Sequence, residues 1–161
     1  MSSFDRRACL ISLAALAGCG FTPIYGTGPS GQASTLRGRI DVAAPKDEEG
    51  FTLVKRLEDR LGLPEAADLG LKAQIRLREE SLGFLPDGEI SRFNVIGQVD
   101  WQLERLGDGA PAASGSERSF TSYSATSTTV ATTFAQRDAR RRLMVILADR
   151  IVTDLLSRDF S

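Results

Sequence analysis

The chain has 161 residues, of which 42% are hydrophobic and 25% are charged, and these proportions are typical of one ordinary folded domain. Its 20 basic and 21 acidic side chains give a formal net charge of -1, which disfavours a dominant nucleic-acid-binding surface. The sequence has no histidine, and this excludes Ser-His-Asp and Cys-His catalysis and His-ligated zinc. We therefore expect no enzyme activity, no cofactor and no metal site.

The first 18 residues have the three-part order of a secretory signal peptide. An arginine pair at positions 6 and 7 precedes an apolar run over residues 8–16, which is too short for the roughly 20 residues of a membrane-spanning helix. The sequence LAGC at residues 16–19 resembles the bacterial lipobox, in which the cysteine is joined to a lipid and becomes the first mature residue. We predict a lipoprotein signal peptide over residues 1–18 and lipidation, including palmitate, at Cys19.

Two alternatives stay open for this segment. Cys19 could be an ordinary small residue near a cleaved leader, or it could form a disulfide with Cys9. Cleavage would discard Cys9 and leave Cys19 alone in an oxidising compartment, a state that lipidation explains. The arginine pair also partly resembles a twin-arginine export signal, although we favour the general secretory route. Because Gly20 and not aspartate follows the cysteine, we expect a lipid-anchored protein of the outer membrane whose domain lies on the periplasmic side.

After the cysteine, residues 19–34 predict a lipidated N-terminus and a flexible tether, because residues 26–34 are rich in Gly, Ser and Pro. Residues 35–161 then form a single domain. The domain begins with a short predicted strand whose apolar residues are Leu36, Ile40 and Val42. Residues 47–61 predict an amphipathic helix that begins with acidic residues and ends at Gly62, with an apolar side made by Phe51, Val54, Leu57 and Leu61.

Two alternating segments predict an antiparallel pair of strands. Residues 71–78 are apolar at odd positions and polar at even positions. In residues 93–103 the odd positions are likewise apolar or glycine, with polar residues at 94, 98, 100 and 102. Pro86-Asp87-Gly88 lies between them and predicts the turn. We expect Trp101 to be buried on this sheet. Residues 107–115 are small and polar and predict a loop, and residues 118–127 are rich in β-formers and predict a third strand.

The C-terminal third predicts a long helix. Thr133 and Gln136 fit a capping box, and a broad apolar stripe follows, made by Phe134, Ala139, Leu143, Ile146, Leu147, Ile151 and Leu155. The order strand, helix, three strands, helix predicts an α+β fold, a small, mainly antiparallel β-sheet with two α-helices packed on one face.

Several charged residues are candidates for catalytic or anion-binding sites. The carboxylates that lie close in sequence sit at turns or strand ends, so we expect them to be solvated and not catalytic; they are Glu79, Glu80, Asp87, Glu89 and Asp108. Arg140, Arg141 and Arg142 are consecutive, cannot share one helix face and are expected to be mostly solvated. The polar side of the strand pair is the candidate for binding anionic head groups, through Lys72, Arg76, Arg78 and Arg92. The alternative is a solvated sheet face that prevents aggregation.

Residues 18–26, GCGFTPIYG, resemble the mature start of the LptE family of lipopolysaccharide-assembly lipoproteins. Alphaproteobacterial members have Cys-Gly-Phe-x-Pro-Leu-Tyr at this place, and Ile24 here replaces the leucine. The order of elements and the runs 137–139 and 147–151 extend the resemblance over nearly the whole chain. The resemblance implies an LptE-like domain that plugs the β-barrel LptD, helps it to assemble and binds lipopolysaccharide on its way to the outer leaflet.

The leading hypothesis is therefore an outer-membrane lipoprotein of lipopolysaccharide transport and membrane biogenesis, with its domain at the periplasmic side or inside the barrel lumen. Its expected partners are an LptD-type outer-membrane β-barrel, lipopolysaccharide and, through its lipid, the membrane, with no nucleic acid. The alternative is an independent lipid- or peptide-binding periplasmic lipoprotein, such as an auxiliary of a lipid transporter. An enzyme that uses carboxylates alone is the least favoured class.

Overall fold

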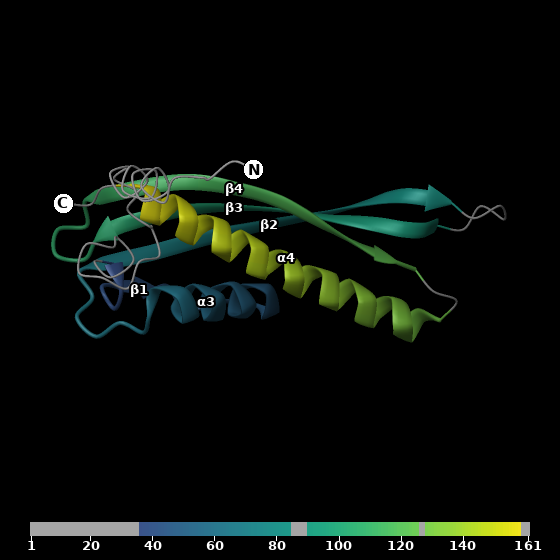
Figure 1. Ribbon diagram of the computed structural model, residues 1–161, viewed down its shortest axis with the longest axis horizontal. Coiled ribbons are helices and arrows are strands. Elements are labelled where there is room, and N and C mark those ends of the chain that lie inside the picture. Colours follow the sequence, from purple (N-terminus) through teal and green to yellow (C-terminus); the bar gives the residue numbers. More distant parts are fainter. Residues whose placement is uncertain (1–35, 85–89, 126–127, 159–161) are drawn as a thin grey trace, which may run out of the picture.

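The computed structural model describes residues 36–84, 90–125 and 128–158 (Figure 1). The predicted signal peptide, Cys19, the tether and the Pro86-Asp87-Gly88 turn lie outside the described residues. The elements follow the chain in the order β1 (Ile40–Val42), α3 (Glu48–Leu61), β2 (Leu69–Phe84), β3 (Ile90–Arg105), β4 (Pro111–Ser124) and α4 (Thr129–Ser157).

The strands form one sheet in the order β1-β2-β3-β4. The short strand β1 is parallel to β2, and α3 connects the two, while the pairs β2–β3 and β3–β4 are antiparallel. Both helices lie on the same face of the sheet, and no described element covers the other face, which we call the open face (Figure 1). The predicted α+β fold, with a mainly antiparallel sheet and two helices on one face, is confirmed.

The core lies between the sheet and the helices because alternate residues of the long strands point to opposite faces. Ala73 of β2 is in register with Trp101 of β3, and the odd-numbered residues of both strands face the helices. Val95 and Val99 are fully buried and Trp101 is 2% exposed, so the predicted alternation and the predicted burial of the tryptophan are confirmed. From the helices the core receives Leu53, Leu57, Leu61, Leu143, Leu147, Ile151 and Leu155.

Helix α3 begins and ends where the sequence predicts. The backbone N–H of Gly50 donates to the Asp47 carboxylate at 2.7 Å, which caps the helix. At the other end Gly62 has φ 83°, a left-handed conformation that glycine adopts without strain. The predicted apolar side is wrong at Phe51, which is 61% exposed. The helix turns Leu53, and not Phe51, toward the core, since Leu53, Leu57 and Leu61 follow one another at intervals of four residues.

The predicted loop at residues 107–115 is wrong over its second half, because β4 begins at Pro111. Gly115 is in register with Trp101. A Cβ atom at Gly115 would lie 2.7 Å from two carbon atoms of the indole ring, which is closer than real contacts allow. Gly115, one of the small residues that predicted a loop, therefore makes room for the tryptophan of the neighbouring strand.

Helix α4 begins one turn earlier than the predicted capping box. Thr128 is the N-cap, and its hydroxyl accepts from the backbone N–H of Ala131 at 3.4 Å. Thr133 lies inside the helix, where its hydroxyl donates to the carbonyl oxygen of Thr129 at 2.9 Å. The predicted apolar stripe is buried except at Phe134 and Ile146, which are 65% and 37% exposed.

Candidate functional site

The open face of the sheet carries three of the four predicted head-group ligands in a row along β2. Lys72, Arg76 and Arg78 alternate with residues that face the helices, and their side chains are 65%, 57% and 64% exposed. Lys72 and Arg78 are six residues apart, which is about 20 Å along a strand. The predicted cations therefore form a line and not a compact cluster.

Each cation of this row has a carboxylate partner on the same face. Lys72 Nζ lies 2.5 Å from Glu104 Oε2, and Arg78 Nη2 lies 2.7 Å from Glu80 Oε1. Arg76 pairs with Asp100, which also accepts from the hydroxyl of Ser116 at 2.7 Å. Pairs this exposed contribute little to stability, in the range of about 0–1 kcal/mol, so the carboxylates can be exchanged for an external anion.

Arg92 is the fourth predicted ligand and lies on β3, in register with Gly83 and Ser124 near the far end of the sheet. It is exposed. On the open face of β2, β3 and β4, the described residues include five cations, Lys72, Arg76, Arg78, Arg92 and Arg118, beside three carboxylates, Glu80, Asp100 and Glu104. The face thus has a modest positive excess, which favours an extended anionic ligand over a single phosphate.

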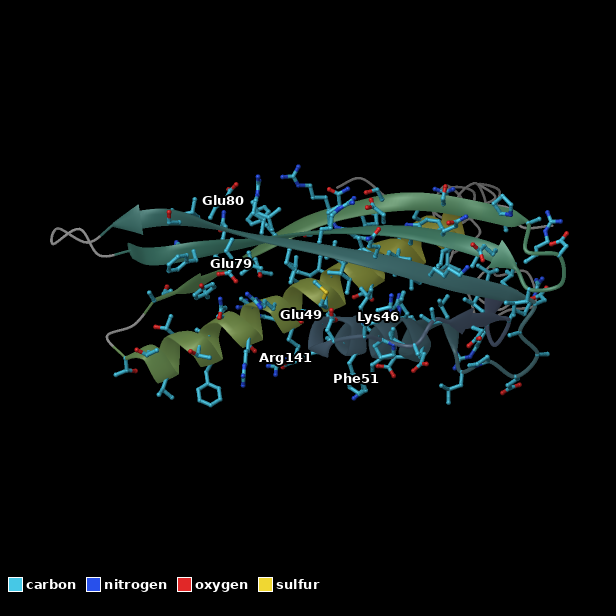
Figure 2. All side chains as sticks on the ribbon, turned by 180° about the vertical axis from the view of Figure 1, so that it is seen from behind. Lys46, Glu49, Phe51, Glu79, Glu80 and Arg141 are labelled. Atoms are coloured by element: carbon cyan, nitrogen blue, oxygen red, sulfur yellow. The ribbon has the colours of Figure 1, made fainter. Side chains whose placement is uncertain are left out.

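A second polar cluster lies on the opposite side of the sheet, around Glu79. Glu79 accepts from the hydroxyl of Tyr123 at 3.1 Å, from Gln136 Nε2 at 2.9 Å and from Arg140 Nη2 at 2.7 Å. Arg140 Nη1 also lies 3.2 Å from Glu49 Oε1. The cluster joins β2, β4, α3 and α4, and Figure 2 shows Glu79 on the helix side of the strand while Glu80 lies on the open side.

The cluster changes the acidity of its members. Burial raises the pKa of Glu79, but the hydrogen bonds from Arg140, Gln136 and Tyr123 outweigh it and hold the pKa below its ordinary value of 4.5. Burial, together with the neighbouring Glu79 carboxylate, raises the pKa of Tyr123 to about 12. Glu79 is therefore an ionised hydrogen-bond acceptor at neutral pH, and Tyr123 keeps its proton.

Glu79 was predicted to be solvated, and this is wrong. Its position is odd, so it continues the series Leu71, Ile75, Leu77 that faces the helices. The parity of the strand could have revealed this, since a charged residue on the buried face needs partners. Arg140 is one of those partners and is half-buried, whereas Arg141 and Arg142 are exposed and pair with Asp138, as expected of a helix surface.

The first turns of α4 lie beyond the core. None of the described side chains at residues 129–138 is buried, and the first buried residue of the helix is Ala139. This segment, which we call the α4 arm, is roughly 15 Å long and extends past the N-terminus of α3 (Figure 1). Two contacts hold its last part, the hydrogen bond from Gln136 to Glu79 and the partly buried Ala135, which packs against the core.

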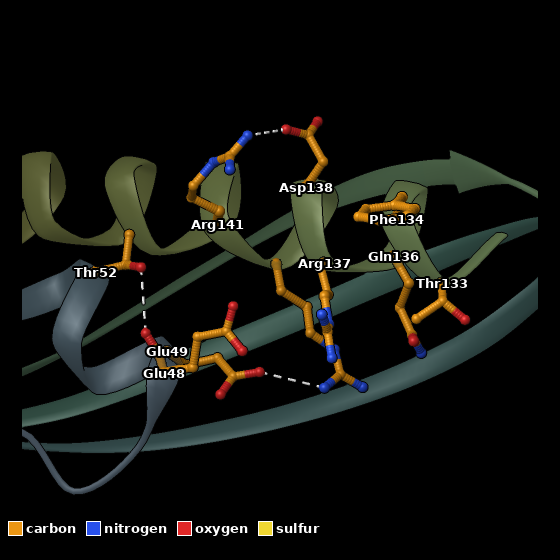
Figure 3. A pocket seen from close by; sticks show the side chains of 10 residues that line it. Glu48, Glu49, Thr52, Thr133, Phe134, Gln136, Arg137, Asp138 and Arg141 are labelled. Carbon is orange, nitrogen blue, oxygen red and sulfur yellow. Dashed lines mark hydrogen bonds and ion pairs between the residues drawn. The ribbon is translucent and has the colours of Figure 1, made fainter. Parts of the chain in front are cut away.

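A pocket of about 750 Å³ lies between the arm and the N-terminus of α3 (Figure 3). Charged side chains from both helices line it, and Phe134 and two threonines complete the wall. The lining residues are Glu48, Glu49, Thr52, Thr133, Phe134, Gln136, Arg137, Asp138, Arg140 and Arg141. The sequence analysis did not identify this pocket, because it joins residues about 90 positions apart, as the Arg140–Glu49 contact shows.

The described residues also give information on metal binding and membrane spanning. No group of three or more His, Cys, Asp or Glu side chains in residues 36–84, 90–125 and 128–158 is placed to hold a metal ion. Within the same ranges, no helix is both long enough and apolar enough to span a membrane.

Comparison with known proteins identifies the family. The model of the LptE family, described as lipopolysaccharide-assembly, matches residues 38–155, from just before β1 almost to the end of α4. Among curated proteins, no sequence matches the chain significantly.

Solved structures share the fold. A lipoprotein candidate from Caulobacter crescentus CB15 has a TM-score of 0.64 and 25% identity, over 81% of this chain and 96% of that chain. Lipoprotein B from Nitrosomonas europaea has a TM-score of 0.59 and 15% identity, over 82% of this chain and 91% of the other. Rare lipoprotein B from Shewanella oneidensis has a TM-score of 0.56 and 18% identity, over 73% of this chain and 92% of the other. The chain belongs to the LptE family of lipopolysaccharide-assembly proteins.

Proposed function

We propose that this chain is a lipid-anchored outer-membrane protein that plugs the lumen of an LptD-type β-barrel, assists its assembly and takes part in lipopolysaccharide transport. Residues 1–18 are its signal peptide, Cys19 is its lipidated first residue, residues 19–34 are the tether and residues 35–161 are the plug. The observation that carries the proposal is the family match over residues 38–155, which covers β1 to β4, α3 and all of α4 but its last two residues. A family described by lipopolysaccharide assembly, and not by a reaction, favours a binding function.

The open face supports a location inside a barrel. The lumen of a transmembrane β-barrel is polar, and some barrels are plugged by other elements. A plug therefore needs a surface whose polar groups are satisfied when bulk water is displaced. On the open face, Asp100 accepts from Ser116, and Ser122 donates to Asn94 at 2.7 Å, so neighbouring side chains already satisfy part of this requirement.

The cation row supports contact with lipopolysaccharide, whose head group carries phosphates. We propose Lys72, Arg76, Arg78 and Arg92 as its ligands. Guanidinium groups bind phosphate oxygens with two hydrogen bonds. The row lets several phosphates along one extended head group be bound in turn, each in exchange for a partner carboxylate.

Arg76→Glu combined with Arg78→Glu should reduce lipopolysaccharide cross-linking to the protein severalfold, while the barrel still co-purifies. The physical reason is that reversing two charges turns the positive excess of the open face into a negative one, and a polyanion is recognised through local charge. The measurement is photo-cross-linking in cells to lipopolysaccharide, with the barrel quantified in the same purified sample.

The matched control is Lys46→Glu combined with Lys55→Glu, which makes the same change in net charge at two exposed residues away from the open face. This control should leave cross-linking unchanged. If both pairs reduce cross-linking equally, the effect is one of overall charge and the open face is not the site. Loss of the barrel with both pairs would indicate a folding defect, which the melting temperature of each variant would reveal.

Cys19→Ala should release the domain from membranes or leave it as an unprocessed precursor, without unfolding it. Cys19 precedes the glycine-rich segment and the residues that form the described helices and strands, so we expect its loss to remove the lipid and leave the domain folded. Labelled palmitate and membrane fractionation are the measurements. Equal palmitate in the variant and the wild type would contradict lipidation at Cys19.

A further inference from the structure

The pocket between the α4 arm and α3 has balanced charge. Its acidic lining consists of Glu48, Glu49 and Asp138, and its basic lining of Arg137, Arg140 and Arg141. Two of these pairs are already formed, Arg140 with Glu49 at 3.2 Å and Arg141 with Asp138. Glu48 and Arg137 remain, and neither carboxylate nor guanidinium has a partner among the residues that the structure describes.

These two side chains stand on opposite walls. Glu48 belongs to the first turn of α3, and Arg137 belongs to the arm; both are exposed. Figure 3 shows Glu48 and Arg137 on either side of the pocket, with the Arg140–Glu49 contact between the two helices. The pocket therefore offers one available negative charge on α3 and one available positive charge on the arm, beside a formed ion pair.

An apolar surface adjoins the charges. Phe134 lines the pocket and is 65% exposed, and Val130, one turn earlier on the same side of the helix, is 67% exposed. Aromatic side chains that stay exposed beside a concave polar site are typical anchors of protein interfaces. Within the arm only Ala135 packs against the core, and it is partly buried, so core packing does not explain why Val130 and Phe134 stay exposed.

The charge balance distinguishes between two classes of ligand. A polyanion such as lipopolysaccharide requires a positive excess, and this pocket has none. A protein segment that carries one basic, one acidic and one apolar side chain matches Glu48, Arg137 and Phe134, respectively.

We infer that this pocket is a docking site for a peptide segment of the barrel partner that bears one basic, one acidic and one apolar side chain. The inference rests on the proposed function, because the barrel is the partner that would enclose this surface. The basic side chain of the segment pairs with Glu48, its acidic side chain pairs with Arg137, and its apolar residue covers Phe134.

The test uses the full-length lipoprotein with a photo-cross-linking amino acid in place of Thr133, which lines the pocket and is exposed. Mass spectrometry identifies the captured protein as the barrel. Glu48→Arg and Arg137→Glu, each introduced into this background, should reduce capture about five- to tenfold, because each places like charges in contact at the interface. Asp59→Arg and Arg105→Glu make the same charge changes at exposed residues outside the pocket and should leave capture unchanged.

The double variant Glu48→Arg with Arg137→Glu distinguishes two roles for these residues. In one they bind side chains of the barrel segment, and in the other they only attract each other across the pocket. If they bind the barrel segment, the double variant should not restore capture of the barrel. Each charged side chain of the segment would then face a residue of like charge. Restored capture would show that the two residues only attract each other and would overturn the inference.

A polyanionic ligand would give a different pattern, in which Glu48→Arg strengthens capture of lipopolysaccharide and Arg137→Glu weakens it; that result would also overturn the inference. If the barrel co-purifies with every variant and capture at Thr133 never changes, the docking site is wrong while the proposed function stands. If no barrel co-purifies with the wild-type protein, the docking site and the proposed function are both wrong.

Discussion

Replacing Trp101 with alanine should lower the free energy of unfolding by about 3–5 kcal/mol, the range for deletion of a large buried aromatic side chain. Trp101 is 2% exposed, its ring lies over Gly115, and the Arg158 guanidinium lies 5.0 Å from the ring centroid. The substitution would leave a cavity between β3, β4 and the end of α4. Urea denaturation followed by circular dichroism is the measurement, because the chain has one tryptophan and the variant loses its fluorescence.

Phe120→Ala is the matched control, since Phe120 is also a large aromatic residue of the sheet but is 62% exposed on the open face. Its effect should be within about 0.5 kcal/mol of the wild type, as is usual for surface positions. Equal urea midpoints for the Trp101 variant and the wild type would mean that the core is packed differently from the structure described above.

Glu79→Gln should lower the free energy of unfolding by about 1–3 kcal/mol at neutral pH, because Arg140 loses a charged partner while the amide keeps only part of the hydrogen bonding. The loss should depend on pH. The pKa of Glu79 is lowered on folding, so the unfolded state binds the proton more readily and acid favours unfolding. The stabilisation by the carboxylate is complete above its unfolded pKa of 4.5 and disappears as the pH falls through the lower folded value.

The difference in unfolding free energy between the wild type and Glu79→Gln should therefore be largest at neutral pH and shrink below pH 4.5. Denaturation at a series of pH values measures it. Glu80→Gln is the control, because Glu80 lies on the open face, is 44% exposed and pairs only with its neighbour Arg78 in the described contacts. A difference that is the same at every pH would contradict the assignment of Glu79 as an ionised, buried acceptor.

The elements that the sequence predicts well are those whose pattern is local. The alternation in β2 and β3 and the acidic start and glycine end of α3 each depend on residues a few positions apart, and all are confirmed. The start of β4 was mispredicted because Gly115 is explained by Trp101 on another strand, and no local rule includes that contact.

The candidate sites likewise depend on contacts between residues far apart in the sequence, which local patterns do not include. Strand parity places Lys72, Arg76 and Arg78 on one polar face, but their ion pairs with Glu80, Asp100 and Glu104 depend on strand register. The pocket was invisible in the sequence, since α3 and α4 approach each other only when both pack on the sheet. The helical periodicity wrongly predicts that Phe134 is buried, because the apolar spacing continues into the α4 arm, whereas the first fully buried residue of the helix is Ala139.

Affinity purification of the tagged, full-length protein from outer membranes, with mass spectrometry of the bound material, tests the central claim most directly. We expect one large β-barrel protein of the LptD type to stay bound through detergent extraction. A protein that purifies from outer membranes as a monomer, without any barrel, would contradict the proposed function and would instead favour an independent lipid- or peptide-binding lipoprotein.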